Sequence, residues 1–209
     1  MISDLRPQPK RKLDQFGVTE ETLEARAQFL SKRGFLSAAK ILFLGDFDLT
    51  SLACLHLIKN SELWVLDSDE EVLDVIKKEG KGALQTIHHN LVSPLPKKLH
   101  ASFDYVFTDP PYTPQGVGLF VSRALEALTL GARARIIFSY GSLDPVRVLA
   151  VQQVILSQGL VIEEILKGFN QYTSAKTIGD TSDLYVLAPT AKTKPSVRGD
   201  YQDKIYTWE

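Results

Sequence analysis

Short apolar runs of strand length alternate with segments of helical period along most of this chain of 209 residues. Such alternation is typical of βαβ units, so it predicts a mostly parallel sheet with helices on both faces. The last two apolar runs lie close together without a strong helix between them, which predicts an antiparallel end to the sheet. We expect strands at 40–45, 62–67, 83–88, 103–108, 133–140, 160–167 and 183–188, and helices at 19–33, 49–59, 69–79, 115–129 and 144–158.

The two ends of the chain differ from its middle in composition. Residues 1–18 are polar, basic and contain prolines, so they are predicted to form an N-terminal arm rather than a packed element. Residues 190–209 are a polar C-terminal tail with aromatic residues near its end, either disordered or wrapped over the domain. The sequence thus predicts one folded domain over residues 19–189.

Overall composition limits the classes of partner. The formal net charge is -1 and the pI is about 6.4, so the chain has no overall basic field and a nucleic-acid partner is not expected. We find no apolar segment that resembles a signal peptide, and no run long enough to predict a membrane span. These features favour a cytoplasmic protein, and they leave open whether it forms a homo-oligomer.

Ligands of such sheets bind beyond the carboxyl ends of the strands, so the residues that follow each strand are informative. The first expected strand runs into "GDFDLTS", which presents Gly45, Asp46 and Asp48. The second ends in "VLDSD", where Asp67 stands in the position of a carboxylate that accepts hydrogen bonds from ribose hydroxyls. A nucleoside ligand is therefore expected.

The two aspartates after the first strand argue against a dinucleotide. Two unit charges about 4 Å apart interact by about 4 kcal/mol at an effective dielectric constant near 20, so Asp46 and Asp48 would repel a pyrophosphate. They favour a nucleoside with a positive centre instead, namely the sulfonium of S-adenosylmethionine or of its decarboxylated form. The alternative is that both residues only cap a helix, because aspartate is common there.

The fourth expected strand runs into "DPPY", residues 109–112. Each proline holds the residue before it out of helical geometry, so the chain leaves the strand extended and stiff. The Asp109 carboxylate, backbone carbonyl groups and the Tyr112 ring then face one small volume. Such acceptors suit an amino group, and the ring stabilises a nitrogen that gains positive charge. This pattern predicts transfer of an alkyl group from sulfur to an amine, although a plain rigid turn is the alternative.

Three blocks carry a resemblance to a known family: "DQFGVTEETLEARAQFLSKRGFLSAAKILFLGDFDLTSLA", "SPLP…FDYVFTDPPYTPQGVGLFVSRALEAL" and "TSDLYVL". They resemble the C-terminal catalytic domain of the branched-chain polyamine synthase family. The resemblance implies a Rossmann-like fold of the class I methyltransferase type. It also implies transfer of aminopropyl groups from decarboxylated S-adenosylmethionine to the secondary amine of spermidine, with release of methylthioadenosine.

The residue pattern and the resemblance together give a set of predicted site residues. The catalytic residues are Asp48, Asp109 and Tyr112. Residues predicted to bind the amine substrate are Pro110, Pro111 and Asp180. Residues predicted to bind the nucleoside donor are Gly45, Asp46, Asp67, Ser68, Asn90 and Leu91. No metal is predicted, because His88 and His89 are adjacent on a strand and point to opposite faces.

Two departures from the family pattern affect the expected substrate. The family's acidic loop reads Gly-Asp-Asp-Asp, and Phe47 replaces its middle aspartate here. Asn90 stands where the family has an aspartate, and it is uncharged although its amide can still bind an adenine edge. Two other functions therefore stay open: an S-adenosylmethionine-dependent methyltransferase acting on an amino group, and a non-catalytic relative that binds nucleosides or polyamines.

Overall fold

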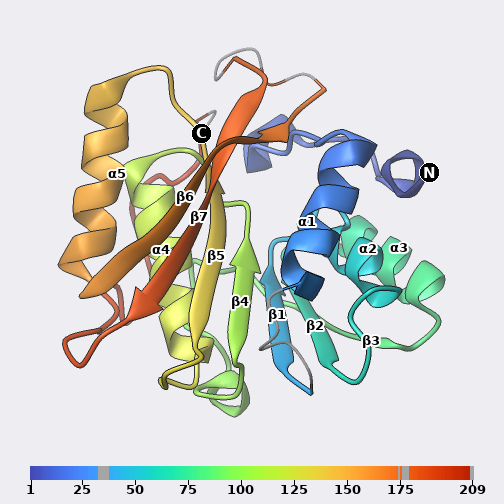
Figure 1. Ribbon diagram of the computed structural model, residues 1–209, viewed down its shortest axis with the longest axis horizontal. Coiled ribbons are helices and arrows are strands. Elements are labelled where there is room, and N and C mark those ends of the chain that lie inside the picture. The colour runs from blue at the N-terminus through green and yellow to red at the C-terminus, as the bar shows by residue number, and fades with distance from the viewer. Residues whose placement is uncertain (33–37, 174, 176–178, 208–209) are drawn as a thin grey trace.

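The computed structural model describes residues 1–32, 38–173, 175 and 179–207, and these form a seven-stranded sheet with helices on both faces (Figure 1). The strand order is β3-β2-β1-β4-β5-β7-β6, in which β1 to β5 are parallel and β7 is antiparallel to both neighbours. The strands are β1 (Lys40–Leu44), β2 (Glu62–Asp67), β3 (Leu84–His88), β4 (Tyr105–Thr108), β5 (Arg135–Tyr140), β6 (Leu160–Gln171) and β7 (Thr181–Pro189). The predicted α/β fold and its antiparallel end are confirmed.

Among the described residues, five α-helices cover the two faces of the sheet, because alternate residues of each buried strand point to opposite sides. Ile41 and Phe43 of β1 belong to the apolar cluster under α1, α2 and α3, whereas Leu42 and Leu44 belong to the cluster under α4 and α5. The helices are α1 (Glu20–Lys32), α2 (Thr50–Leu55), α3 (Glu70–Gly80), α4 (Pro114–Ala127) and α5 (Pro145–Ser157). Short 3-10 helices lie at Ile2–Leu5, Arg11–Leu13 and Lys97–Leu99.

The boundaries differ from the prediction in a few places. Helix α2 ends at Leu55 instead of residue 59, because the chain turns through Ile58, whose N–H donates to Cys54, and through Asn60 with φ of 62°. Strand β6 continues past the predicted residue 167, since it pairs with β7 up to Gln171. The predicted end of the first helix at residue 33 lies outside the described residues.

Residues 1–18, which we call the N-terminal segment, are packed against the domain, so the expectation of an unpacked arm is wrong. The N–H groups of Ile2 and Ser3 donate to the carboxylate of Glu20 at 3.1 and 2.8 Å. The Lys10 ammonium lies 2.6 Å from the Asp69 carboxylate. These contacts fix the segment across the end of the sheet where the ligand is expected.

The C-terminal tail, described from residue 190 to residue 207, wraps over the domain, which was one of the two alternatives. The guanidinium of Arg123 donates to the carbonyl of Gly199 at 2.7 Å, and the N–H of Tyr201 donates to the carbonyl of Val92 at 2.8 Å. Ile205 is buried in the cluster under α4 and α5. In Figure 1 the N-terminal segment, in dark blue, runs along the upper side of the molecule past α1.

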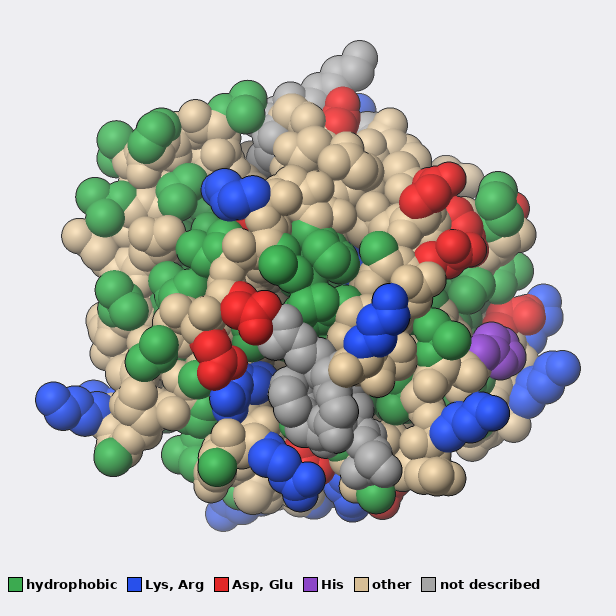
Figure 2. All heavy atoms as spheres, viewed as in Figure 1, with side chains coloured by type: hydrophobic (Ala, Val, Ile, Leu, Met, Phe, Trp, Pro, Cys, Tyr) green, Lys and Arg blue, Asp and Glu red, His purple; other side chains and the backbone are tan. Residues whose placement is uncertain are grey.

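The surface seen in Figure 2 is mixed in charge. Lys and Arg side chains are spread over this face among Asp and Glu, and hydrophobic side chains gather on the side of α5, where Val146 and Leu149 are exposed. This face therefore shows no continuous basic surface among its described residues. Across the described part of the chain, no helix is both long and apolar enough to cross a membrane.

Candidate active site

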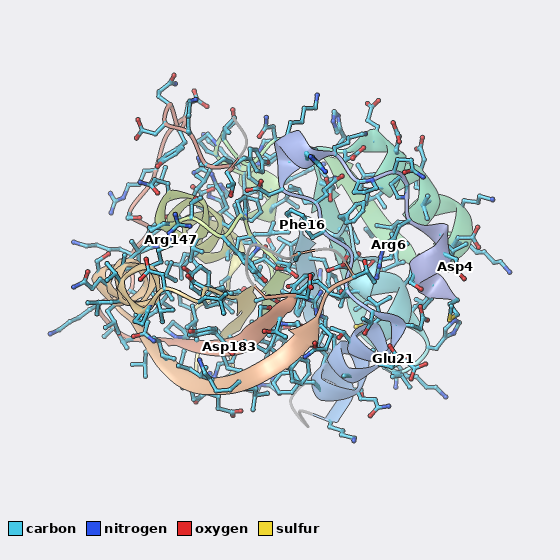
Figure 3. The ribbon with its side chains drawn as sticks, turned by 90° about the horizontal axis from the view of Figure 1, so that it is seen from above. Asp4, Arg6, Phe16, Glu21, Arg147 and Asp183 are labelled. Atoms are coloured by element: carbon cyan, nitrogen blue, oxygen red, sulfur yellow. The ribbon has the colours of Figure 1, made fainter. Side chains whose placement is uncertain are left out.

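A cavity of about 170 Å³ lies beyond the carboxyl ends of β1, β2 and β4. Strand order reverses between β1 and β4, which is where open α/β sheets bind their ligands. The cavity is lined by the acidic loop (Gly45–Asp48), by the "DPPY" residues 109–112, by residues 13–16 of the N-terminal segment and by residues 206–207 of the tail. Viewed onto this end of the sheet, Phe16 lies between Arg6 and Arg147 (Figure 3).

On one side of the cavity, Asp46 and Asp67 are held by backbone N–H groups. Gly45 turns the loop with φ of 67°, and the N–H of Asp46 then donates to Asp67 Oδ2 at 2.8 Å. The Asp46 carboxylate accepts from the N–H groups of Thr50 and Ser51 at 2.9 and 3.1 Å. We call Asp46 and Asp67 the donor-side pair, because the sequence assigns both to the nucleoside donor.

Burial dominates the electrostatics of the donor-side pair. It raises the pKa of Asp46 to about 7, against the lowering effect of its bonds to Ser51. The pKa of Asp67 is likewise raised by burial, although the N–H groups of Asp46 and Asp69 oppose the shift. Neither carboxylate forms an ion pair with a described residue. With no counter-ion among the described residues, a cationic ligand at this side of the cavity would favour the charged form of both carboxylates.

On the other side, Asp48 and Asp109 share one buried cation, the guanidinium of Arg26. Arg26 Nη1 lies 2.9 Å from Asp48 Oδ2, and Nη2 lies 2.6 Å from Asp109 Oδ2. Arg6 adds a second guanidinium 3.6 Å from Asp48 Oδ1. We call Asp48 and Asp109 the acceptor-side pair, because the sequence assigns both to the amine that accepts the alkyl group.

Two tyrosines complete the acceptor side. Tyr112 Oη donates to Asp109 Oδ1 at 2.9 Å, Tyr172 Oη donates to Asp109 Oδ2 at 2.8 Å, and the two hydroxyls lie 2.5 Å apart. Burial raises the pKa of both phenols well above the ordinary value, so they stay protonated and act as donors. Pro111 is fixed by the first turn of α4, since a Cβ on Gly116 would lie 2.8 Å from it. Asp109 therefore has a defined orientation.

The structure brings together ten of the predicted residues and leaves two outside the cavity. Asn90 caps a turn, where its side chain accepts from the N–H of Val92 at 3.1 Å. Asp180 lies in the connection before β7, where its carbonyl accepts from the N–H of Tyr172 at 2.8 Å. The predicted residues that line the cavity are Gly45, Asp46, Asp48, Asp67, Ser68, Leu91, Asp109, Pro110, Pro111 and Tyr112.

Arg26, Tyr172 and Phe16 are among the residues of the site that were not predicted from the sequence. Arg26 had a detectable signal, because it shares the apolar face of its helix with Leu23 and Ala27, where a charge requires a buried partner. Tyr172 and Phe16 follow no local pattern. They reach the cavity only through the β6–β7 pair and the N-terminal segment.

The fold places the chain in a broad class. A putative RNA methyltransferase from Pyrococcus horikoshii superposes with a TM-score of 0.69 at 18% identity, covering 88% of this chain and 90% of that one. This likeness shows the Rossmann-like fold of S-adenosylmethionine-dependent methyltransferases. The chain belongs to the branched-chain polyamine synthase family, since residues 1–207 match the family model described as the branched-chain polyamine synthase A C-terminal domain.

Two relatives support this assignment. An N(4)-bis(aminopropyl)spermidine synthase from Thermococcus kodakarensis is 33% identical over 98% of this chain and 60% of its own length. The crystal structure of the branched-chain polyamine synthase from Thermus thermophilus, in complex with N4-aminopropylspermidine and 5'-methylthioadenosine, has a TM-score of 0.83 at 27% identity. That match covers 98% of this chain and 66% of the other. The chain spans between 50% and 60% of the length of the curated relatives it matches.

Proposed function

We propose that this chain transfers an aminopropyl group from decarboxylated S-adenosylmethionine to an amine nitrogen of a spermidine-like polyamine, with release of methylthioadenosine. The observation that carries the proposal is the charge of the cavity. Its lining includes five carboxylates against two guanidinium groups, Arg26 and Arg147, and Arg6 adds a third guanidinium beside Asp48. The excess of negative charge favours a cationic donor and a polyamine over anionic ligands. The carboxylates belong to Asp14, Asp46, Asp48, Asp67 and Asp109.

In the proposed mechanism the donor-side pair holds the nucleoside. Asp67 accepts hydrogen bonds from the ribose hydroxyls, and Asp46 lies beside the cationic aminopropyl group. This arrangement places the propyl carbon next to sulfur in line with the acceptor side. The amine and the carbon are then held in the geometry that the displacement needs.

The displacement itself needs a nitrogen with a free lone pair. The nitrogen attacks the propyl carbon next to sulfur, and the carbon–sulfur bond breaks with its electron pair going to sulfur. The sulfonium thus becomes the neutral thioether of methylthioadenosine. Asp48 accepts the proton of the attacking amine, directly or through water, and with Asp109 it stabilises the cationic nitrogen as it forms.

Methyl transfer from S-adenosylmethionine is the second candidate, and Arg147 favours it. This residue lines the cavity, and its guanidinium forms no ion pair with a described residue, so it is suited to a ligand carboxylate. The donor with its carboxylate intact then has one favourable contact. The carboxylates of the donor-side pair oppose its binding.

Product analysis separates these functions. The purified protein is incubated with spermidine and each donor in turn, and the amine product is identified by mass spectrometry. We expect an aminopropylated amine with the decarboxylated donor and no methylated amine with S-adenosylmethionine. A methylated product would replace the proposal by the second candidate. Binding of methylthioadenosine without turnover of either donor would identify a non-catalytic member of the family.

A further inference from the structure

Arg26 is a fully buried cation at the centre of the acceptor side, and neither the sequence pattern nor the family resemblance assigns it a role. It projects from α1 with a relative exposure of 0%. Its Cζ lies 5.3 Å from the centroid of the Phe107 ring, which covers one face of the guanidinium. A buried guanidinium is costly unless anions and hydrogen bonds compensate its charge.

Every donor of this guanidinium has a partner. A guanidinium offers five N–H groups, and Arg26 makes five hydrogen bonds to acceptors from separate parts of the chain. The two anionic acceptors follow β1 and β4, so one planar group sets the spacing of both carboxylates. The acceptors are Asn170 Oδ1 at 2.8 Å, Asp48 Oδ2 at 2.9 Å, Thr50 Oγ1 at 3.3 Å, Asp109 Oδ2 at 2.6 Å and Ser139 Oγ at 3.1 Å.

The two carboxylates still keep room for a substrate. An ionised carboxylate has about four acceptor positions. Asp48 accepts hydrogen bonds from Arg26 and from the N–H of Val18, and Asp109 accepts from Arg26, Tyr112 and Tyr172. Each carboxylate therefore retains a position that an amine N–H can use without displacing Arg26.

The charges that face Asp48 come from several elements. Arg26 on α1 and Arg6 in the N-terminal segment lower its pKa, whereas burial and the charge of Asp109 raise it. Asp46 lies in the same loop, and Tyr172 lies at the end of β6. Burial is the largest of these effects, so the pKa of Asp48 lies above its ordinary value even with both cations present.

We propose that Arg26 is a positioning residue that holds Asp48 and Asp109 at one fixed spacing and keeps Asp48 ionised as the proton acceptor for the amine. The role of Arg26 in turnover rests on the proposed function. The charge balance, by which we mean that Arg26 compensates the buried charge of Asp48, does not. The two parts are tested separately.

The charge balance is tested by the stability of Arg26→Met against urea at pH 5 and pH 8. Without its cation, Asp48 has a higher pKa in the folded state, so it is protonated and tolerated at low pH but destabilising as pH rises through that pKa. We expect the difference in urea midpoint between wild type and Arg26→Met to be about twice as large at pH 8 as at pH 5. When Arg26→Met is introduced into Asp48→Asn, the loss in urea midpoint should depend less on pH.

An equal difference in urea midpoint at pH 5 and pH 8 would contradict the proposal that Arg26 compensates the charge of Asp48. If Arg26→Met does not fold, Arg6→Gln gives the same test, because its ion pair with Asp48 is longer and its side chain lies at the edge of the network. This variant should show a shift of the same sign and smaller size. No dependence on pH in Arg6→Gln would then count against the proposal.

The role in turnover is tested by the pH dependence of kcat/KM. We expect the acidic limb of the profile to move to higher pH in Arg26→Met. In Arg26→Lys the limb should stay near the wild-type position while kcat falls, since lysine keeps the charge but not the planar set of donors. Arg123→Gln is the matched control, because Arg123 is equally buried but does not belong to the acceptor side. Its guanidinium lies 2.6 Å from the carboxylate of Glu126.

The control should lose stability without any movement of the acidic limb. If Arg26→Met turned over amine with an unshifted profile, Arg26 would be only structural. If wild type transferred no aminopropyl group, the proposed function would fail while the urea experiment still decided the charge balance.

Discussion

The donor-side and acceptor-side pairs use the same side chain in two different ways. Asp46 and Asp48 are two positions apart in one loop, yet Asp46 is held by backbone N–H groups, whereas Asp48 is held by two arginines as well as by the N–H of Val18. The first arrangement leaves a carboxylate whose charge no described cation balances, and the second gives a carboxylate with a built-in counter-ion. The comparison teaches that two aspartates of one motif can have different partners, so the role of each cannot be assigned from the motif alone.

The largest expected effect is that of Asp48→Asn on turnover. Asparagine keeps the shape but cannot take the proton of the amine, so kcat should fall roughly 100-fold or more, the scale of a lost acid–base group. The affinity for methylthioadenosine, measured by calorimetry, should change much less, because the donor-side pair is untouched. Near wild-type turnover in a folded variant would remove the distinction between the two pairs.

The next effect is that of Asp67→Ala on nucleoside binding. The affinity for methylthioadenosine should fall by about 1.5–3 kcal/mol, the usual range for hydrogen bonds to a charged group. Asp104→Ala is the matched control, since Asp104 accepts a hydrogen bond from the N–H of Lys40 at 2.9 Å at the other end of β1 and does not line the cavity. The control should cost stability while nucleoside affinity stays close to that of wild type, and equal affinities in both variants would place the ribose elsewhere.

A smaller effect is expected for the choice of donor. The carboxylates of the donor-side pair repel the carboxylate of S-adenosylmethionine and attract the ammonium of its decarboxylated form. Calorimetry should therefore show tighter binding of the decarboxylated donor by about tenfold or more, which corresponds to about 1.4 kcal/mol. Equal or reversed affinities would mean that Arg147, not the aspartates, determines which donor binds more tightly.

The smallest effect is a dependence of donor affinity on pH. Asp46 has a pKa of about 7, so it is protonated below pH 7 and gains negative charge as pH rises above that value. The affinity for the decarboxylated donor should rise a few-fold between pH 6 and pH 8, while that for uncharged methylthioadenosine should stay constant. In Asp46→Asn both affinities should be flat, and a persisting rise would assign the titration to another group.

The fold could be predicted from the sequence because each strand is a short buried apolar run. Periodicity places β2 and the start of α5 within a residue of their observed bounds, whereas the early end of α2 depends on turn hydrogen bonds that leave no periodic signal. In the site, the sequence predicts the residues that follow strands, such as Asp67 and Asp109. Contacts between distant segments, above all that of Arg26 with both carboxylates, depend on tertiary packing and could not be read from local pattern.

A contact between the N-terminal segment and the C-terminal tail bears on synthesis of the chain. The N–H of Thr207 donates to the Asp14 carboxylate at 2.7 Å, and both residues line the cavity. A chain still attached to the ribosome has the acidic loop and the "DPPY" residues long before it has residue 207. The cavity wall is therefore completed only when residues 206–207 have emerged, and a chain that lacks them should not retain the nucleoside.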